Sequence, residues 1–326
     1  MTDNPDAIII GAGIAGLAAA QVLVDAGRRV RVIDKGRGVG GRMATRRIGK
    51  ARLDHGAQFF TVRTEPFERL VRAAIEDGIV DVWCTGFTAD DGYPRYYCPS
   101  GMTGLTKSMA THLSDQGVDI VLGTRAEAIL QRDQWVIEFD GAASVRAPTF
   151  LSTAPVPQTL DLLAAGDVGL EAEVAAQLAA IEYKRAFALL VTLDRPSAIG
   201  EPGGIQQSEQ ELFTFIGDNQ RKGVSEAPAV TFHVNGEVSG MRWDDSPEAI
   251  VADLLPEAAP WLGDASVTEV QVHKWKYAGP LVPFPERHLL VCTEPGPLVV
   301  AGDAFGGPKV EGAYLSGQSA AVALLA

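Results

Sequence analysis

The sequence has 326 residues, 46% of them hydrophobic, so the chain is long enough to bury one large core or the cores of two domains. It carries 41 acidic and 28 basic residues, and this net charge of -13 disfavours nucleic acid and anionic membrane surfaces as partners. We see no signal peptide or membrane span, and the three cysteines are too widely spaced for a disulfide framework or a zinc site. We therefore expect a soluble, cytoplasmic protein without a metal.

The first strand and helix of the chain predict a nucleotide-binding turn. An apolar run at residues 7–10 enters a turn with Gly11, Gly13 and Gly16, and a helix is expected from residue 14 to about residue 26. Gly11 permits the tight turn, Gly13 lets backbone N–H groups approach a pyrophosphate, and Gly16 permits close packing of the helix on the strand. The pyrophosphate would lie at the N-terminus of this helix, beside Ile14 and Ala15.

A second strand at residues 29–33 ends at Asp34, which completes a βαβ unit. The carboxylate of Asp34 is placed to accept hydrogen bonds from ribose hydroxyls, and it would repel a 2′-phosphate. The ligand predicted here is therefore FAD or NAD. A lone Gly-x-Gly-x-x-Gly turn does not choose between them, and some proteins that are not enzymes also carry it.

The remaining elements follow from periodicity and from proline and glycine positions. We expect helices at residues 65–77, 103–114, 156–164, 170–181, 247–255 and 312–325. We expect strands at residues 80–83, 95–98, 119–122, 125–131, 135–139, 150–155, 186–193, 212–216, 229–234, 267–274 and 298–301, and a surface loop at 195–209.

Strand-helix-strand units at both ends of the chain flank a middle that is rich in strands, which predicts an α/β protein with two discontinuous domains. Residues 1–62, 100–155 and 286–326 are expected to form a Rossmann-type dinucleotide-binding domain. Residues 63–99 and 156–285 are expected to form an α+β substrate-binding domain on a mixed or antiparallel sheet.

Three further stretches favour FAD. Arg37-x-x-Gly40-Gly41-Arg42 follows the acidic strand end, and an arginine there can neutralise a pyrophosphate. The small residues of Asp54-x-Gly56-Ala57-Gln58-Phe59 would let the backbone reach a flavin ring. Near the end of the chain, Gly302-Asp303 and then Val310-Glu311-Gly312 place a carboxylate and a helix N-terminus where they can hold a ribityl hydroxyl and a reduced pyrimidine ring. The simpler alternatives are a solvated basic loop, an ordinary turn and a helix-capping Asp303.

Taken together, these stretches resemble the flavin-containing amine oxidase superfamily, and within it the renalase family. The resemblance covers most of the chain, and it includes residues that lie outside the dinucleotide-binding motifs. The matching stretches are Asp34-Lys35, Gly40-Gly41-Arg42-Met43-Ala44-Thr45, Asp54-x-Gly56-Ala57-Gln58-Phe59, Pro99-x-Gly101-Met102, Thr153-Ala154-Pro155-Val156-Pro157, Asp218-Asn219-x-x-Lys222 and His273-Lys274-Trp275-Lys276-Tyr277-Ala278.

The resemblance implies an FAD oxidase that takes hydride from 2- or 6-dihydro-NAD(P) isomers onto flavin N5, releases NAD(P)⁺ and reduces O₂ to H₂O₂. Such a transfer needs a planar donor held against the flavin and no protein base, because aromatisation of the ring drives it. No residue is therefore assigned as catalytic with certainty. The cofactor-binding residues that we expect are Gly11, Gly13, Ile14, Ala15, Gly16, Asp34, Lys35, Gly40, Gly41, Arg42, Met43, Ala57, Gln58, Phe59, Ala126, Gly302, Asp303, Val310 and Glu311.

The candidate substrate-side residues are Trp275, Tyr277, Asn219, Lys222 and His273. Trp275 and Tyr277 alternate on one expected strand and so share a face, which by resemblance looks towards the flavin; a core position is the alternative. Asn219 and Lys222 are candidates for hydrogen bonds to a carboxamide or phosphate, with a solvated turn as the alternative, and His273 is expected to be structural.

Two departures from the superfamily pattern matter. Residues 275–286 lack the cysteine that covalent flavin attachment would use, and Cys292 lies in an apolar run where a buried, inert thiol is expected, so we expect non-covalent FAD. No lysine can be assigned as a flavin-facing lysine. An amine oxidase or desaturase and a non-catalytic nucleotide-binding protein remain the alternatives, and the expected partners are a small molecule and O₂, in a monomer or a homodimer.

Overall fold

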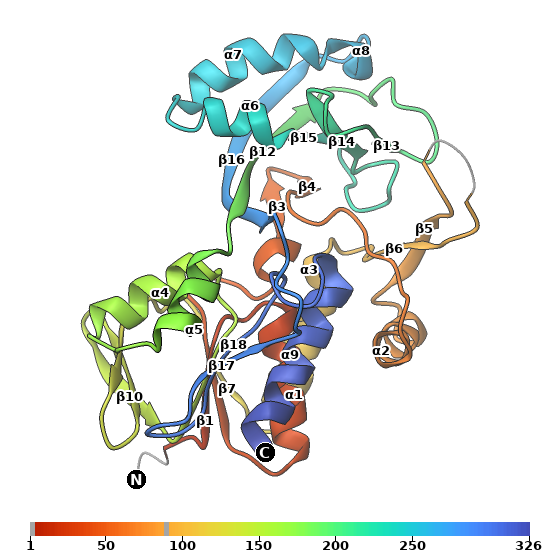
Figure 1. The fold of residues 1–326 in the computed structure, drawn as a ribbon. Coiled ribbons are helices and arrows are strands. Elements are labelled where there is room, and N and C mark those ends of the chain that lie inside the picture. The colour runs from red at the N-terminus through yellow and green to blue at the C-terminus, as the bar shows by residue number, and fades with distance from the viewer. Residues whose placement is uncertain (1–3, 88–90) are drawn as a thin grey trace. The chain divides into compact units, whose positions relative to one another are not determined.

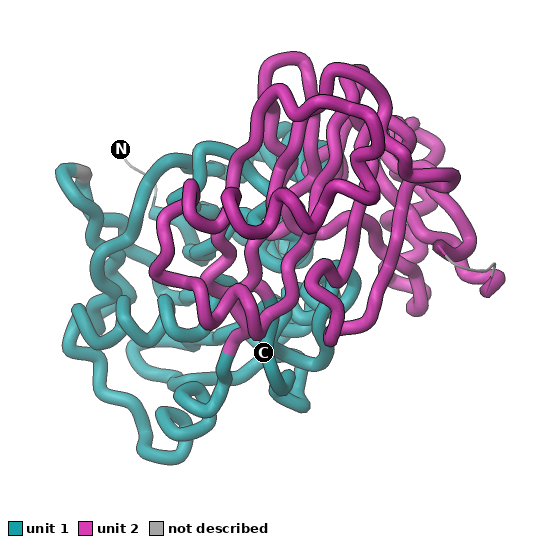
Figure 2. Tube along the Cα trace, turned by 90° about the horizontal axis from the view of Figure 1, so that it is seen from above, with its two compact units in different colours: residues 1–41, 106–182, 279–326 teal, residues 42–105, 183–278 magenta. Residues whose placement is uncertain are grey.

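The computed structural model describes residues 4–87 and 91–326, and the chain folds into two compact units (Figure 2). Unit 1 comprises residues 1–41, 106–182 and 279–326, and unit 2 comprises residues 42–105 and 183–278. The predicted domain limits differ from these units at residues 156–182, which lie in unit 1, and at residues 42–62, which lie in unit 2. Residues 42–62 do so because Ile48 and Leu53 pack in one apolar cluster with Leu190 of unit 2.

A six-stranded sheet forms the centre of unit 1. Neighbouring strands are parallel except at one edge, where β17 runs antiparallel to β18. Ile9, Leu151 and Val299 lie at the centre of its core and are fully buried. The strand order is β17 (Leu289–Cys292), β18 (Leu298–Val300), β11 (Thr149–Ser152), β1 (Ala7–Ile10), β2 (Val30–Ile33) and β7 (Asp119–Val121).

Two helices of unit 1, α1 (Ile14–Asp25) and α9 (Lys309–Leu325), lie side by side, although they come from the two ends of the chain (Figure 1). A Cβ on Gly317 would lie 1.9 Å from the backbone oxygen of Ala15, so the two helix backbones are in direct contact. A Cβ on Gly16 would lie 1.9 Å from the oxygen of Gly11, which shows how closely α1 follows the turn after β1. Glycine is required at both positions.

A second, three-stranded antiparallel sheet belongs to unit 1, and α4 packs on it. Gly166, which ends α4, would place a Cβ 1.7 Å from the oxygen of Ile129, so this contact is also close. The elements are β8 (Ala126–Gln131), β9 (Trp135–Phe139), β10 (Ala142–Ala147), α4 (Val156–Ala165) and α5 (Ala172–Ala179), and α3 (Thr103–Asp115) enters unit 1 from unit 2.

Unit 2 contains a five-stranded sheet in which the β13–β14, β14–β15 and β12–β15 pairs are antiparallel. The core on one of its faces includes Phe187, Phe232 and Ile250. The strand order is β13 (Gly204–Gln206), β14 (Phe213–Asp218), β15 (Ala229–Val234), β12 (Tyr183–Leu193) and β16 (Val267–Pro280), so β16 is an edge strand. The other elements are the hairpin β3 (Thr45–Ile48) and β4 (Ala51–Asp54), the pair β5 (Asp81–Cys84) and β6 (Arg95–Tyr97), α2 (Glu65–Glu76), α6 (Gly236–Met241), α7 (Pro247–Glu257) and α8 (Ala259–Leu262).

The structure corrects the sequence predictions at several points. Residues 195–209 are not simply a surface loop, because Ser197 and Ile199 are buried and β13 pairs with β14. The last helix begins at Lys309 rather than at residue 312. Cys292 is half-buried rather than buried. The sequence did not predict the strands β3, β4, β10 and β17 or the helices α6 and α8. No helix in the described chain is both long and apolar enough to span a bilayer.

Candidate functional site

The turn between β1 and α1 has the geometry of a phosphate cradle. Gly11 adopts a φ of +108°, which favours glycine, and Gly13 is the N-cap of α1. A Cβ on Gly13 would meet nothing within 4 Å, so the space in front of this turn is open. No side chain caps α1 and its first turn holds no acidic residue, so its free N–H groups can donate hydrogen bonds to a phosphate.

Asp34 follows β2 and lies beside this turn. Ala12 N–H donates to its Oδ2 at 2.7 Å, and Gly36 N–H donates to its Oδ1 at 2.6 Å. Each carboxylate oxygen can still accept one more hydrogen bond, because an ionised carboxylate has about four lone-pair positions. The two backbone donors fix the carboxylate of Asp34, which stays partly exposed. Lys35 donates to Gln158 Oε1 at 2.9 Å, and burial lowers its pKa.

The glycine pair that follows also approaches the phosphate cradle. Gly40 N–H donates to the oxygen of Ala12 at 2.9 Å, and a Cβ on Gly41 would lie 3.8 Å from Cα of Gly13. Both glycines have positive φ values, of 110° and 52°. A side chain on Gly41 would therefore narrow the space in front of the turn.

Five more expected cofactor residues lie at the C-terminal end of unit 1 and on β8. Gly302 has a φ of +132°, and its N–H donates to Ser316 Oγ at 2.8 Å, which fixes the loop after β18 to α9. Asp303 is half-buried in that loop. Val310 and Glu311 lie in the first turn of α9, and Ala126 begins β8. The β1–α1 turn, Asp34 and the N-terminus of α9 all belong to unit 1.

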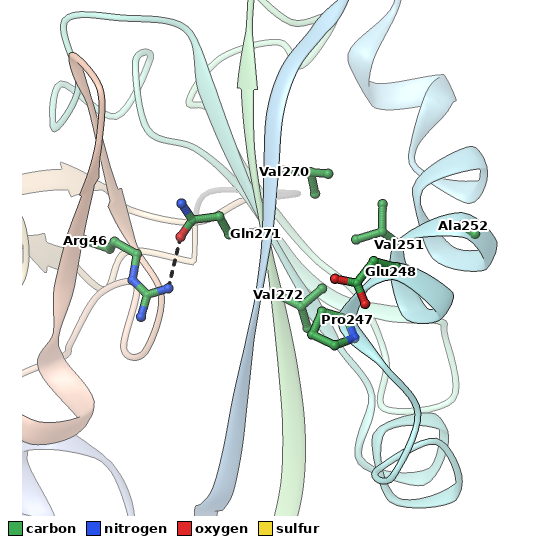
Figure 3. Close-up of a pocket in the computed structure, with 8 residues that line it drawn as sticks. All are labelled: Arg46, Pro247, Glu248, Val251, Ala252, Val270, Gln271 and Val272. Atoms are coloured by element: carbon green, nitrogen blue, oxygen red, sulfur yellow. Dashed lines mark hydrogen bonds between the residues drawn. The ribbon is translucent and has the colours of Figure 1, made fainter.

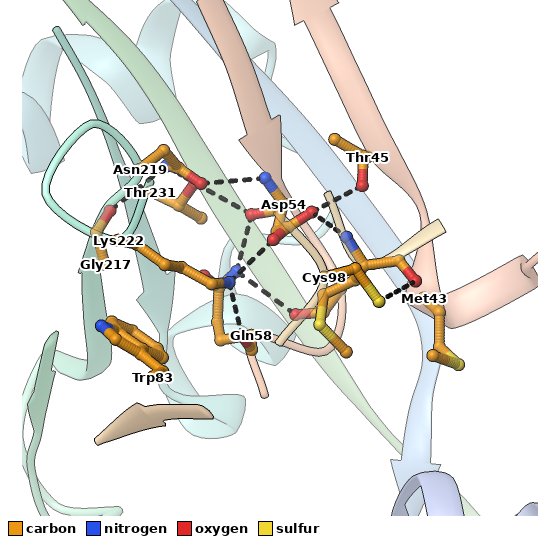
Figure 4. Close-up of polar contacts among 12 residues, drawn as sticks. Met43, Thr45, Asp54, Gln58, Trp83, Cys98, Gly217, Asn219, Lys222 and Thr231 are labelled. Carbon is orange, nitrogen blue, oxygen red and sulfur yellow. Dashed lines mark hydrogen bonds and ion pairs between the residues drawn. The ribbon is translucent and has the colours of Figure 1, made fainter. Parts of the chain in front are cut away.

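Unit 2 holds a buried polar network centred on Asp54 and Lys222, which are 0% and 2% exposed (Figure 4). Lys222 Nζ lies 2.7 Å from Asp54 Oδ2 and also donates to the backbone oxygen of Gln58. Thr45 Oγ1 donates to Asp54 Oδ1, which also accepts from Met102 N–H. The carboxylate of Asp54 is thus held by three segments of the chain.

The backbone of Asp54 is held as firmly as its side chain. Its N–H donates to Asn219 Oδ1 at 3.1 Å, and its oxygen accepts from Thr231 Oγ1 and from Gln58 Nε2. Asn219 is fully buried and donates in turn to Thr231 Oγ1. The alternative of a solvated turn for Asn219 and Lys222 is therefore wrong.

This network orders the segment 54–59, which the sequence assigned to the flavin ring. Ala57 N–H donates to the oxygen of Arg42, and a Cβ on Gly56 would lie 1.9 Å from that same oxygen. Met43, which follows Arg42 in the chain, is buried. Sequence reasoning named Asp54 only as the first residue of a motif and gave it no role, and it missed Thr231. A buried charge needs a buried partner of opposite charge. The available signals for this pair were the Asp54-x-Gly56 spacing and the Asp-Asn-x-x-Lys stretch that ends at Lys222.

Trp275, His273 and His55 form one ring cluster in unit 2. Trp275 Nε1 donates to the oxygen of His55 at 2.7 Å, and the two rings are stacked with centroids 5.3 Å apart. The ring of His273 lies 4.3 Å from that of Trp275, and the ring of Tyr183 lies 5.5 Å from that of Tyr277. Arg42 Nη1 donates to the backbone oxygen of Tyr277.

A different aromatic cluster surrounds Phe59. The rings of Phe59, Trp83 and Phe87 lie with centroids between 5.0 and 6.5 Å apart, and Phe215 joins them. The ammonium of Lys222 lies 4.9 Å from the centre of the Trp83 ring. The cluster thus places apolar surface beside the Asp54 network. The face of Trp83 is already occupied by a cation, the ammonium of Lys222.

Because of two histidines in unit 2, we predict that the free energy of unfolding depends on pH. Burial lowers the pKa of His55 to about 3 and that of His233 to about 4, from 6.5. The unfolded chain therefore binds more protons below pH 6.5, so the stabilisation is complete above pH 6.5 and is lost as the pH falls towards 4. Urea unfolding between pH 7 and 5 should show the free energy of unfolding falling with pH. In His233→Gln this slope should be smaller by up to about 1.4 kcal/mol per pH unit, and an unchanged slope would contradict the assignment.

The parallel sheet and the β1–α1 turn are typical of a dinucleotide-binding protein. A sequence profile for an NAD(P)-binding Rossmann-like domain matches residues 9–74, and a profile for flavin containing amine oxidoreductases matches residues 81–325. The chain belongs to this flavin-containing amine oxidoreductase family, and it is an FAD-dependent enzyme.

Two curated proteins are similar in sequence. L-amino-acid oxidase of Echis ocellatus is 48% identical over 50 residues, which are 15% of this chain and 10% of that protein. Protein FixC of Escherichia coli O157:H7 is 24% identical over 338 residues, covering 98% of this chain and 74% of that protein. The 50-residue match is too short to carry the activity of the whole oxidase to this chain.

Solved structures show the same fold. A proposed protoporphyrinogen oxidase from Exiguobacterium superposes with a TM-score of 0.73 at 14% identity, with 99% of each chain covered. An oxidoreductase from Methanosarcina mazei gives 0.67 at 15% identity, with 96% of this chain and 99% of that chain covered. Putrescine oxidase gives 0.66 at 15% identity, with 99% of each chain covered. At these identities the likeness is one of fold.

Proposed function

We propose that this enzyme oxidises 2- or 6-dihydro-NAD(P) isomers to NAD(P)⁺ with non-covalently bound FAD, and that O₂ is reduced to H₂O₂. FAD, when bound, supplies the hydride acceptor at N5. The observation that carries the proposal is the aromatic surface at β16, where Trp275 is oriented by the oxygen of His55 and stands beside His273. Such a surface suits a flat, uncharged ring such as a dihydronicotinamide.

The Asp54 network supports this donor over an amine. An ammonium substrate is stabilised by a carboxylate or by the open face of an aromatic ring. Here the buried carboxylate of Asp54 is already neutralised by Lys222, and the same lysine lies over the Trp83 ring. A second cation in this network would meet the like charge of Lys222.

The residues of unit 2 then position the donor and exclude water. Burial keeps His55 and His273 neutral, with pKa values lowered to about 3 and about 4. Neither ring therefore adds a charge of its own to oppose the positive charge that develops on the nicotinamide as hydride leaves. A positive charge that does contact this cluster is the guanidinium of Arg46, whose Nη2 lies 3.4 Å from His273 Nδ1. Asn219 and Lys222 are committed to Asp54, so we now assign them to the support of segment 54–59 and not to direct contact with substrate.

Anaerobic mixing tests the reaction itself. Addition of 2- or 6-dihydro-NAD to the yellow enzyme should bleach the flavin absorbance within seconds, and NAD⁺ should appear in equal amount. Air should then restore the colour and produce H₂O₂. Bleaching by an amine or a polycyclic substrate instead would favour an amine oxidase or desaturase, and persistent colour with every reductant would favour a nucleotide-binding protein without turnover.

The absorption spectrum tests how the cofactor is held. Heat precipitation of the purified enzyme should release all yellow colour into the supernatant, because residues 275–286 lack the cysteine that covalent flavin attachment would use. Colour that stays with the pellet would contradict non-covalent binding.

A further inference from the structure

An open pocket of about 540 Å³ lies at the edge strand β16 of unit 2 (Figure 3). Arg46 and Gln271 face each other on one side of β16, and the residues of α7 lie on the other side. The lining residues are Arg46, Pro247, Glu248, Val251, Ala252, Val270, Gln271 and Val272.

Arg46 brings a positive charge to this pocket that no carboxylate neutralises. Its Nη1 donates to Gln271 Oε1 at 3.1 Å, and its Nη2 lies 3.4 Å from His273 Nδ1. Both partners are neutral side chains, and burial lowers the pKa of His273 to about 4. In the described part of the chain, Arg46 has no acidic group within ion-pair distance, although the protein has a net charge of -13. The guanidinium is held in place but keeps its charge for a ligand.

The other charge in the pocket limits where an anion can lie. Glu248 stands at the start of α7, on the far side of β16 from Arg46 (Figure 3). Hydrogen bonds from its own backbone N–H and from Ser246 lower its pKa, so it is ionised at neutral pH. An anion is therefore repelled from the α7 side and attracted to the side of Arg46 and Gln271.

The same face of β16 links Arg46 to the proposed donor site. Gln271, His273 and Trp275 alternate along the strand, so their side chains share one face. Gln271 and Trp275 are four residues apart, which corresponds to about 13 Å along a strand. A ribose and its phosphates can cover that span when the nicotinamide ring lies at Trp275.

We propose that Arg46 binds a phosphate group of the dinucleotide substrate, with Gln271 and His273 fixing the guanidinium. The inference rests on the proposed function, because it takes the ring of the donor to lie at Trp275. The pyrophosphate and the 2′-phosphate of an NADP-type substrate share the chemistry that Arg46 would recognise.

The test compares substrates with and without phosphate in Arg46→Gln. The KM for 6-dihydro-NAD and 6-dihydro-NADP should rise about tenfold to a hundredfold, with kcat unchanged. The KM for 6-dihydronicotinamide riboside, which has no phosphate, should stay the same. Arg47→Gln is the matched control, because it removes the same charge from the next residue of β3, which is exposed. It should leave all three KM values unchanged.

Binding of NADP⁺, followed by tryptophan fluorescence, separates this inference from the proposed reaction. The Kd should rise by the same factor in Arg46→Gln and not in Arg47→Gln, whether or not dihydronicotinamides reduce the flavin. If KM rises only for 6-dihydro-NADP, Arg46 binds the 2′-phosphate. If KM rises for both 6-dihydro-NAD and 6-dihydro-NADP, Arg46 binds the pyrophosphate. Equal effects on the riboside and the nucleotides, or an unchanged Kd, would overturn the proposal.

Discussion

In urea, Lys222→Met should lower the free energy of unfolding by about 3 to 5 kcal/mol, because it leaves the carboxylate of Asp54 buried without its counter-charge. Methionine keeps most of the volume of the lysine side chain, so the loss would report on charge rather than on a cavity. The two side chains are 0% exposed in the ion pair, and they lie 2.7 Å apart. Denaturation curves fitted by linear extrapolation would measure the change.

Two further variants separate the charge from general damage. Lys184→Met removes an exposed lysine that pairs with Glu209, and it should change stability by less than about 1 kcal/mol. The double variant Lys222→Met with Asp54→Asn should recover part of the loss, since no charge then stays buried. If Lys222→Met were as mild as Lys184→Met, the ion pair would not be what stabilises segment 54–59.

Gly13→Val should yield a folded protein that carries no flavin. The backbone of Gly13 has a φ of -77°, which any residue can adopt, and a Cβ there would meet nothing within 4 Å. The apoprotein should therefore stay within about 1 kcal/mol of wild-type apoprotein, the cost of a poorer N-cap. The added side chain would fill the space that a pyrophosphate needs. The flavin-to-protein absorbance ratio after purification measures the effect.

Gly169→Val provides the control for this substitution. Gly169 is also free of neighbours within 4 Å and is exposed between α4 and α5, so the variant should retain a full complement of flavin. Normal flavin content in Gly13→Val would contradict the assignment of the β1–α1 turn to the cofactor.

Elements with a strong local pattern could be predicted from the sequence. The strand at residues 135–139 and the strand at residues 229–234 match β9 and β15 residue for residue. The six-residue strand β10 was missed because Ala142–Ala147 has little hydrophobic alternation, and its pairing with β9 decides its conformation. Lys309 was not assigned to the last helix because Gly312 looked like a boundary. In the structure Gly312 serves close packing, with its Cβ position 2.0 Å from the oxygen of Gly307.

The motifs of the candidate site could be predicted from the sequence, but the contacts between residues far apart in the sequence could not. The glycine turn and Asp34 follow from spacing alone, because the motif lies within residues 11–34 and the side chain of Asp34 accepts hydrogen bonds from the nearby residues Ala12 and Gly36. The pairing of Asp54 with Lys222 joins residues 168 positions apart, and nothing in a single sequence encodes that distance. The environment of Arg46 was hidden for the same reason, since its partners Gln271 and His273 lie on β16.

The close contact of α1 with α9 also bears on how the protein is made. A ribosome releases the chain from its N-terminus, yet β18 and α9 of unit 1 are among the last elements to emerge. Unit 2, by contrast, is complete once residue 278 has left the tunnel. Although the nucleotide turn is synthesised first, its supporting sheet must wait for the end of translation. We expect the nascent chain to acquire its cofactor only after residues 298–325 are available, and unit 2 to fold before unit 1.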